Sequence, residues 1–152
     1  MKKHVILPLL MIAFPIFVQA QNNEVSPENS VKLFFEAFHD QDTTAMRSLT
    51  YGEISLQSIG KDKMGTAQIS SESFDDFLKS MATIPKTVVF QEKIDSYETK
   101  IDDSLAHVWT PYSFFLNGKL SHCGVNSFQL FKFEGDWKII SILDTRRRNC
   151  GD

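Results

Sequence analysis

Cysteine is scarce in this chain of 152 residues, which contains only Cys123 and Cys150. Two cysteines so far apart in the sequence do not resemble a structural zinc site, which needs closely spaced pairs of ligands. The histidines that follow residue 20 are also far from one another, and they are His39, His107 and His122. The sequence therefore predicts no metal site, and no motif in it indicates another cofactor.

Patterns of covalent catalysis and of polyanion binding are missing as well. No serine is flanked by glycines as in a nucleophile elbow. Without Lys2 and Lys3, the chain carries 14 basic against 19 acidic residues, a net charge of −5. A net acidic protein is a poor general binder of nucleic acid or of anionic membranes. The three consecutive arginines at 146–148 stand out against this acidic background, but they do not predict a nucleic-acid partner.

One long hydrophobic run occurs, and it lies at the N-terminus. Two lysines precede an uncharged apolar stretch at residues 5–18, and small residues follow at the positions that signal peptidase reads. The run is too short for a membrane span. We therefore predict a secretory signal peptide at residues 1–20 and one domain at residues 21–152. That domain is expected to be exported, to the periplasm or the medium, without membrane association after cleavage.

Export changes the interpretation of the two cysteines. In an oxidising compartment a lone pair of cysteines mostly forms one disulfide, so we predict a bond between Cys123 and Cys150. Two free buried thiols are the alternative.

Hydrophobic periodicity predicts three helices in the first half of the exported chain. The first begins near Ser26, where serine can cap the helix and Pro27 suits its first turn. Apolar residues then recur at positions i, i+3, i+4 and i+7. Asp42 is predicted to cap a short second helix, and Ser71 a third helix that ends before Pro85.

The second half of the chain is rich in branched and aromatic residues and predicts strands. A short strand is expected near residues 54–59. Turn signals, of which Asn117-Gly118 is the strongest, then separate four strands at about 88–101, 105–116, 119–133 and 137–145. This order predicts an α+β fold with a curved antiparallel sheet of about four to six strands wrapped around the N-terminal helices. Such a cone leaves a concavity that suits a small-molecule pocket.

Two segments resemble the nuclear transport factor 2-like superfamily (NTF2-like), in its SnoaL-like branch. They are "VKLFFEAFHDQDTTAMRSLT" and "SFQLFKFEGDWKIISILD", the latter with its acidic-glycine turn before Trp137. The resemblance implies a cone-shaped, cystatin-like α+β fold with a pocket between the helices and the concave sheet, and a homodimer through the other face. The superfamily contains enzymes, binding proteins and assembly modules, and its enzymes use Asp, His and Tyr inside the cone for proton transfer. The resemblance therefore does not select one function.

Strand register predicts which side chains share a face of the sheet. A two-residue turn at 117–118 places Ser113 opposite His122 and Trp109 opposite Asn126. Opposed residues point to the same side of a sheet, and so do residues two apart along a strand.

The last hairpin leaves two registers open. A three-residue loop at 134–136 places Asn126 opposite Asp144 and Gly124 opposite Arg146. A two-residue loop shifts the register by one and moves Asp144 and Arg146 to the other face. We favour the first register because it matches more apolar pairs.

On this register one face collects the candidate site. We predict ligand contacts from five side chains, His107, Trp109, Ser113, Asn126 and Arg146. The favoured function is binding of a small ligand rather than catalysis. The alternatives are a proton-transfer enzyme of the dehydratase or isomerase type with His122 and Asp144 as its acid–base pair, and a dimeric interaction module.

Overall fold

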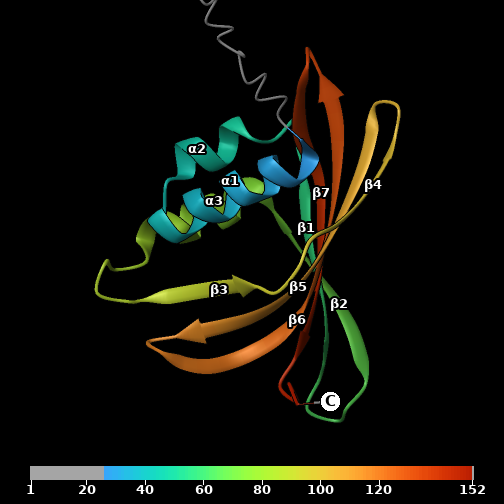
Figure 1. Cartoon of the computed structure of the whole chain (residues 1–152). Helices are drawn as coiled ribbons and strands as arrows, with labels where there is room; N and C mark the ends of the chain where they lie inside the picture. The colour runs from blue at the N-terminus through green and yellow to red at the C-terminus, as the bar shows by residue number, and fades with distance from the viewer. Residues whose placement is uncertain (1–25, 152) are drawn as a thin grey trace, which may run out of the picture.

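A bent sheet with three helices against its concave face forms the part of the chain described by the computed structural model, residues 26–151 (Figure 1). Along the chain the elements are α1 (Pro27–Asp40), α2 (Thr43–Ser48), β1 (Ser55–Lys61), β2 (Ala67–Ser73), α3 (Phe74–Thr83), β3 (Phe90–Ile94), β4 (Glu98–Asp102), β5 (Leu105–Leu116), β6 (Lys119–Phe133) and β7 (Asp136–Arg147). The predicted signal peptide lies outside the described residues. Within them, no helix is long and apolar enough to cross a membrane.

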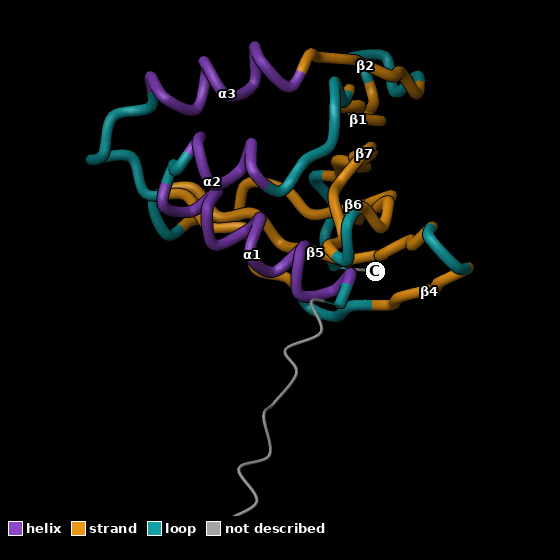
Figure 2. Tube along the Cα trace, turned by 90° about the horizontal axis from the view of Figure 1, so that it is seen from above, coloured by secondary structure: helices purple, strands orange, loops and turns teal. Residues whose placement is uncertain are grey.

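The seven strands follow the order β2-β1-β7-β6-β5-β3, and β4 also pairs with β5. β1 runs parallel to β7, whereas the other pairs are antiparallel, so the sheet is mixed. Figure 2 shows the helices gathered on one side of the bent sheet. The predicted α+β class and curved sheet are confirmed.

The first two helices begin where their capping residues predict. The Ser26 hydroxyl accepts a hydrogen bond from the Asn29 backbone amide at 3.2 Å, which satisfies one of the free amides at the start of α1. The Asp42 carboxylate accepts one from the Ala45 amide at 2.9 Å and starts α2.

The third helix begins later than predicted. Its cap is Ser73, whose hydroxyl accepts from the Asp76 amide at 3.1 Å, whereas Ser71 lies in β2. Both serines have a capping side chain, but the antiparallel ladder between β1 and β2 extends as far as Ser73 and keeps Ser71 extended. Tertiary pairing thus decides between two similar local signals.

The sheet has more strands than predicted for two reasons. All residues of β2 are exposed, so this edge strand lacks the apolar alternation by which a strand is recognised in a sequence. The single strand predicted at 88–101 is divided into β3 and β4. Both pair with β5, β3 along Tyr112–Leu116 and β4 along Leu105–Trp109.

A β-bulge in the β5–β6 hairpin changes which residues face the helices. Next to the turn, Leu116 pairs with Lys119 as predicted, but the register shifts between Phe114 and Phe115. Beyond the shift Phe114 pairs with His122. Every pair farther from the turn is therefore displaced by one residue from the predicted register, which is wrong there.

A second bulge, in the β6–β7 hairpin, restores the predicted pairing of the residues beyond it. The turn contains two residues, since Phe133 pairs with Asp136, and the predicted three-residue loop is wrong. The register then shifts between Gln129 and Leu130, and beyond this point Asn126 pairs with Asp144. The Gly124–Arg146 pair also forms, so these two predicted pairs are confirmed even though the predicted loop is not.

A disulfide joins Cys123 and Cys150, whose Cα atoms are 5.8 Å apart. It ties the residues that follow β7 to the neighbouring strand β6. The predicted pairing is confirmed, and a disulfide is compatible with an exported protein.

Gly124 allows an unusually close approach between three strands. A Cβ atom at this position would lie 1.7 Å from the Thr145 carbonyl oxygen and 2.9 Å from the Cε1 atom of Tyr112. The Tyr112 ring lies over the glycine as its cross-strand partner, and its hydroxyl is 3.0 Å from the same Thr145 oxygen. Only glycine therefore permits this position of the tyrosine.

We expect Gly124→Ala to destabilise the protein by at least about 2 kcal/mol, because the added methyl group must displace Tyr112 or the β7 backbone. Chemical denaturation measures the change. Gly60→Ala is the matched control, since Gly60 also lies in a strand and a Cβ atom there meets nothing within 4 Å. Equal stability of the two variants would contradict the packing described for Gly124.

Candidate functional site

A cavity of about 810 Å³ lies between α1, α3 and the concave face of the sheet. Every helical side chain that lines it is apolar; these are Phe34, Phe35 and Phe38 of α1 with Phe77 and Met81 of α3. The sheet contributes apolar residues too, but it also carries polar groups, which are Gln57, Ser58, Ser70, Ser71, Glu72, Glu92, Tyr112, His122, Asn126, Asp144 and Arg146. The cavity thus has an apolar helical wall opposite a partly polar sheet wall.

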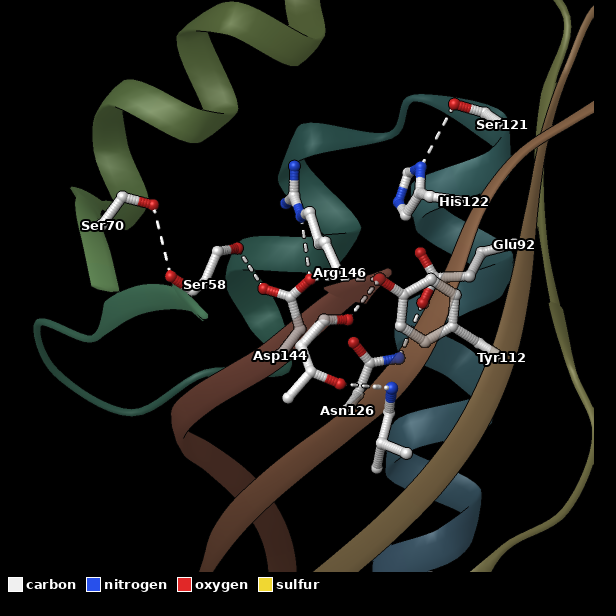
Figure 3. A network of polar contacts seen from close by, with 11 residues as sticks. Ser58, Ser70, Glu92, Tyr112, Ser121, His122, Asn126, Asp144 and Arg146 are labelled. Atoms are coloured by element: carbon white, nitrogen blue, oxygen red, sulfur yellow. Dashed lines mark hydrogen bonds and ion pairs between the residues drawn. The ribbon is translucent and has the colours of Figure 1, made fainter. Parts of the chain in front are cut away.

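Asp144 lies at the centre of the polar wall (Figure 3). It is buried, with 9% of its surface exposed, and its carboxylate accepts hydrogen bonds from three strands. Ser58 of β1 donates to Oδ1, and Arg146 donates through Nε to Oδ2 at 2.9 Å. The Tyr112 hydroxyl is 3.2 Å from Oδ2 and can donate its single proton there or to Thr145. These donors offset the cost of burying the charge.

Glu92 forms a second polar group with Asn126. The Asn126 side-chain amide donates to Glu92 Oε1 at 2.7 Å, and it lies 3.3 Å from the Thr110 hydroxyl. Burial raises the pKa of Glu92 to about 7, an effect that the hydrogen bond from Asn126 opposes and the charge of Asp144 increases. Glu92 can therefore gain or lose a proton near neutral pH.

The sequence prediction missed Glu92, although its strand contains the signal. Phe90, Glu92 and Ile94 alternate with exposed residues, so Glu92 is a lone acidic residue at an inward position. Its backbone amide also donates to His39 Nε2 at 3.0 Å, which joins β3 to the end of α1. Burial lowers the pKa of His39, and an acceptor nitrogen requires the neutral ring.

His122 lines the same cavity as Asp144, but the predicted acid–base pair is not formed. The His122 ring stacks on Phe114 with centroids 4.8 Å apart, and its Nδ1 lies 3.2 Å from the Ser121 hydroxyl. Burial and the charge of Arg146 lower the pKa of His122. Within residues 26–151, no hydrogen bond joins His122 to Asp144. A catalytic role for either residue stays a hypothesis.

Of the five predicted ligand contacts, Asn126 and Arg146 line the cavity and the other three do not. His107, Trp109 and Ser113 lie on the convex face, because the bulge in the β5–β6 hairpin reverses their orientation. The prediction that they share one pocket with Asn126 is wrong. His107 Nε2 is 2.9 Å from the Ser127 hydroxyl, and Trp109 beside it is 39% exposed. The homodimer predicted through this face stays a prediction.

The cavity wall offers three chemical capacities. Glu92 can exchange a proton, Arg146 can bind an anion through its terminal nitrogens, and the phenylalanine side chains can hold an apolar group. Among the residues that the structure describes, no cluster of three or more His, Cys, Asp or Glu side chains could hold a metal ion.

Helices packed in the concavity of a bent sheet also occur in solved structures. An NTF2-like protein from Cytophaga hutchinsonii superposes with a TM-score of 0.61 at 14% identity, covering 79% of this chain and 94% of the other. The fold is NTF2-like. A candidate dehydratase of the NTF2-like family from Streptomyces avermitilis gives a TM-score of 0.57 at 16% identity, covering 78% and 91% of the two chains.

A third structural neighbour has a different described role. It is the beta subunit of a candidate aromatic-ring-hydroxylating dioxygenase from Novosphingobium aromaticivorans, with a TM-score of 0.63 at 10% identity and coverage of 78% and 85%. No family model matches the sequence, and no curated protein matches it. At these identities the likeness shows the NTF2-like fold alone, and the SnoaL-like branch stays a prediction.

We expect Glu92→Gln to stabilise the protein at pH 8 by on the order of 1 kcal/mol and to change little at pH 4.5. The folded-state pKa of Glu92 is raised from 4.5 to about 7, so the stability that this group contributes is complete below pH 4.5 and is lost as the pH rises through 7. Glutamine keeps the neutral form and the acceptor for Asn126. Denaturation at several pH values measures the difference.

Glu98→Gln, on the exposed strand β4, is the control for removing one negative charge. If the two variants show the same dependence on pH, Glu92 does not titrate as described.

Proposed function

We propose that the chain binds a small amphiphilic molecule in the cavity between α1, α3 and the sheet. The observation that carries this proposal is the contrast between the two walls of a cavity of about 810 Å³, one apolar and one partly polar. Pockets for small ligands have volumes of roughly 300–1,000 Å³ and combine apolar linings with a few polar groups. An apolar part of the ligand would pack on the phenylalanine side chains, and a polar part would face the Asp144 network.

The physical basis of the affinity is removal of apolar surface from water. Phe38, Phe77 and Phe90 are only partly buried, although they pack against the core. A ligand that covers them gains roughly 25 cal/mol for each Å² of apolar surface taken from water. The disulfide supports placing this activity in an oxidising compartment outside the cytoplasm.

A second candidate is proton transfer on a ligand bound in the same cavity, and Glu92 favours it. A carboxyl group with a pKa of about 7 is matched to acid–base work at neutral pH. Asn126 orients this carboxyl group through the hydrogen bond at 2.7 Å. One structural neighbour, from Streptomyces avermitilis, is described as a candidate dehydratase, which supports proton transfer as a chemistry that this fold can accommodate.

We expect 4-phenylbutanol to bind the wild-type protein, and Leu116→Trp to weaken binding at least about fivefold by narrowing the cavity. Leu116 lines the cavity and is 43% exposed, so the larger side chain should not disturb the core. Titration calorimetry measures the affinity. Leu120→Trp is the matched control, because Leu120 is exposed in the same hairpin and does not line the cavity.

Binding that both tryptophan variants retain unchanged would place the ligand elsewhere on the protein. Absence of binding by the wild type to any phenyl-substituted amphiphile of this size would refute the proposed function.

The second candidate predicts exchange of carbon-bound hydrogen in a ketone. We expect deuterium from the solvent to enter 4-phenyl-2-butanone next to its carbonyl group, with a rate that rises through about pH 7 as Glu92 loses its proton. Nuclear magnetic resonance measures the rate. Glu92→Gln should slow it at least about tenfold, and Glu98→Gln should not. Exchange no faster than in buffer would remove this candidate.

A further inference from the structure

Arg146 is the cation of the polar wall, and only part of its guanidinium group is used. Its Nε donates to Asp144 Oδ2 at 2.9 Å. Within residues 26–151 its two terminal nitrogens donate no hydrogen bond, and 59% of the side chain is exposed. Arginine stays protonated at any pH at which the protein is folded. The cavity wall therefore carries a permanently charged guanidinium group with a planar pair of free donors.

The Asp144 carboxylate has little capacity left for a ligand. Oδ1 accepts from Ser58, and Oδ2 accepts from Arg146 with the Tyr112 hydroxyl at 3.2 Å. Its charge is also balanced by the adjacent guanidinium group. Asp144 is therefore a positioning residue that fixes the direction of Arg146, and it does not attract a cation into the cavity.

Glu92 is a second carboxyl group of the cavity wall, and Glu72 of the exposed strand β2 is a third. Charged and titratable groups reach Glu92 from three elements. Asp144 and Arg146 of β7 act on it through their charges, and His39 of α1 accepts from its backbone amide. Tyr112 of β5 stays neutral, because burial and the charges of Asp144 and Glu92 raise its pKa. Asn126 of β6 donates to Glu92 Oε1. With a pKa of about 7, this group can become neutral at little cost when a second anion arrives.

We propose, on the premise of the proposed function, that the polar end of the ligand is a carboxylate held by the terminal nitrogens of Arg146, and that Glu92 takes up a proton as it binds. The fork of a guanidinium group matches the two oxygens of a carboxylate, and such paired hydrogen bonds are about twice as strong as neutral ones. The bound anion raises the pKa of Glu92 further, so near pH 7 the complex holds more protons than the free protein, in which this group is only partly protonated. Affinity must then fall as the pH rises through 7.

Three molecules that share one phenylbutyl group separate this inference from the proposed function. They are 4-phenylbutyrate, 4-phenylbutanol and 4-phenylbutylamine, each titrated at pH 6 and pH 8. We expect the carboxylate to bind tightest at pH 6 and about fivefold more weakly at pH 8, whereas the alcohol binds equally at both. In two buffers of different ionisation enthalpy, calorimetry at pH 7 should report net proton uptake with the carboxylate only.

Two substitutions test the assigned roles. Arg146→Gln should lower the affinity for 4-phenylbutyrate at least about tenfold. The affinity for 4-phenylbutanol should stay within about twofold of the wild-type value, which also shows that the cavity is intact. Arg147→Gln removes the neighbouring charge, and the Arg147 side chain does not line the cavity. This variant should therefore change the affinity for neither 4-phenylbutyrate nor 4-phenylbutanol. Glu92→Gln should abolish the dependence of carboxylate affinity on pH.

The outcomes are distinguishable. If the alcohol or the amine binds as tightly as the carboxylate at pH 6, or if Arg146→Gln leaves the carboxylate unaffected, the inference is wrong and the proposed function stands. If none of the three molecules binds, the proposed function fails and the inference fails with it.

Discussion

A carboxylate buried in a sheet must receive hydrogen bonds, and the way in which Asp144 receives them organises the polar wall of the cavity. Its donors come from β1, β5 and β7, so three strands must keep one relative position. The parallel pairing of β1 with β7 brings Ser58 directly beside Asp144. Because an unpaired buried charge costs several kcal/mol, a slip of any of these strands is penalised. The position of Arg146, and with it the anion-binding capacity of the cavity, depends on this arrangement.

Two irregularities of the sheet make the arrangement possible. The bulge in the β5–β6 hairpin turns Tyr112 toward the helices, on the side that His122 and Asn126 of β6 face, and the bulge in the β6–β7 hairpin turns Asp144 and Arg146 to the same side. Without the first, Tyr112 would lie on the convex face, away from Asp144. Gly124 then provides the space in which the tyrosine ring crosses the strand. The polar wall is thus a product of local departures from regular pairing.

The parts of the structure that depend on local signals could be predicted from the sequence. The α1 cap at Ser26 and the turn at residues 117–118 belong to this group, and the disulfide partners could be predicted because the chain contains only two cysteines. The orientation of β5 could not be predicted, because a bulge depends on how two strands fit over their whole length. His107 and Trp109 were for this reason assigned to the wrong face.

Part of the candidate site could also be predicted from the sequence. Asn126, Asp144 and Arg146 follow from the register of the last hairpin, whose two-residue turn and bulge together produce the same pairing as the longer loop. Glu92 was missed because its role depends on strands distant in sequence, and only the folded structure brings it to Asn126. A single acidic residue in the inward positions of a strand is the signal that could have identified it.

The disulfide also bears on how the polar wall assembles. Cys123 and Cys150, separated by 27 positions, close a covalent ring that contains the whole β6–β7 hairpin after Cys123, and therefore Asn126, Asp144 and Arg146. These three side chains remain members of one small ring even in the unfolded, oxidised chain. The cross-link lowers the conformational entropy of the unfolded chain, so bringing β6 and β7 together during folding costs less entropy. Oxidation should consequently favour early pairing of β6 with β7. The strands β1 and β5 then add Ser58 and Tyr112 to the polar wall.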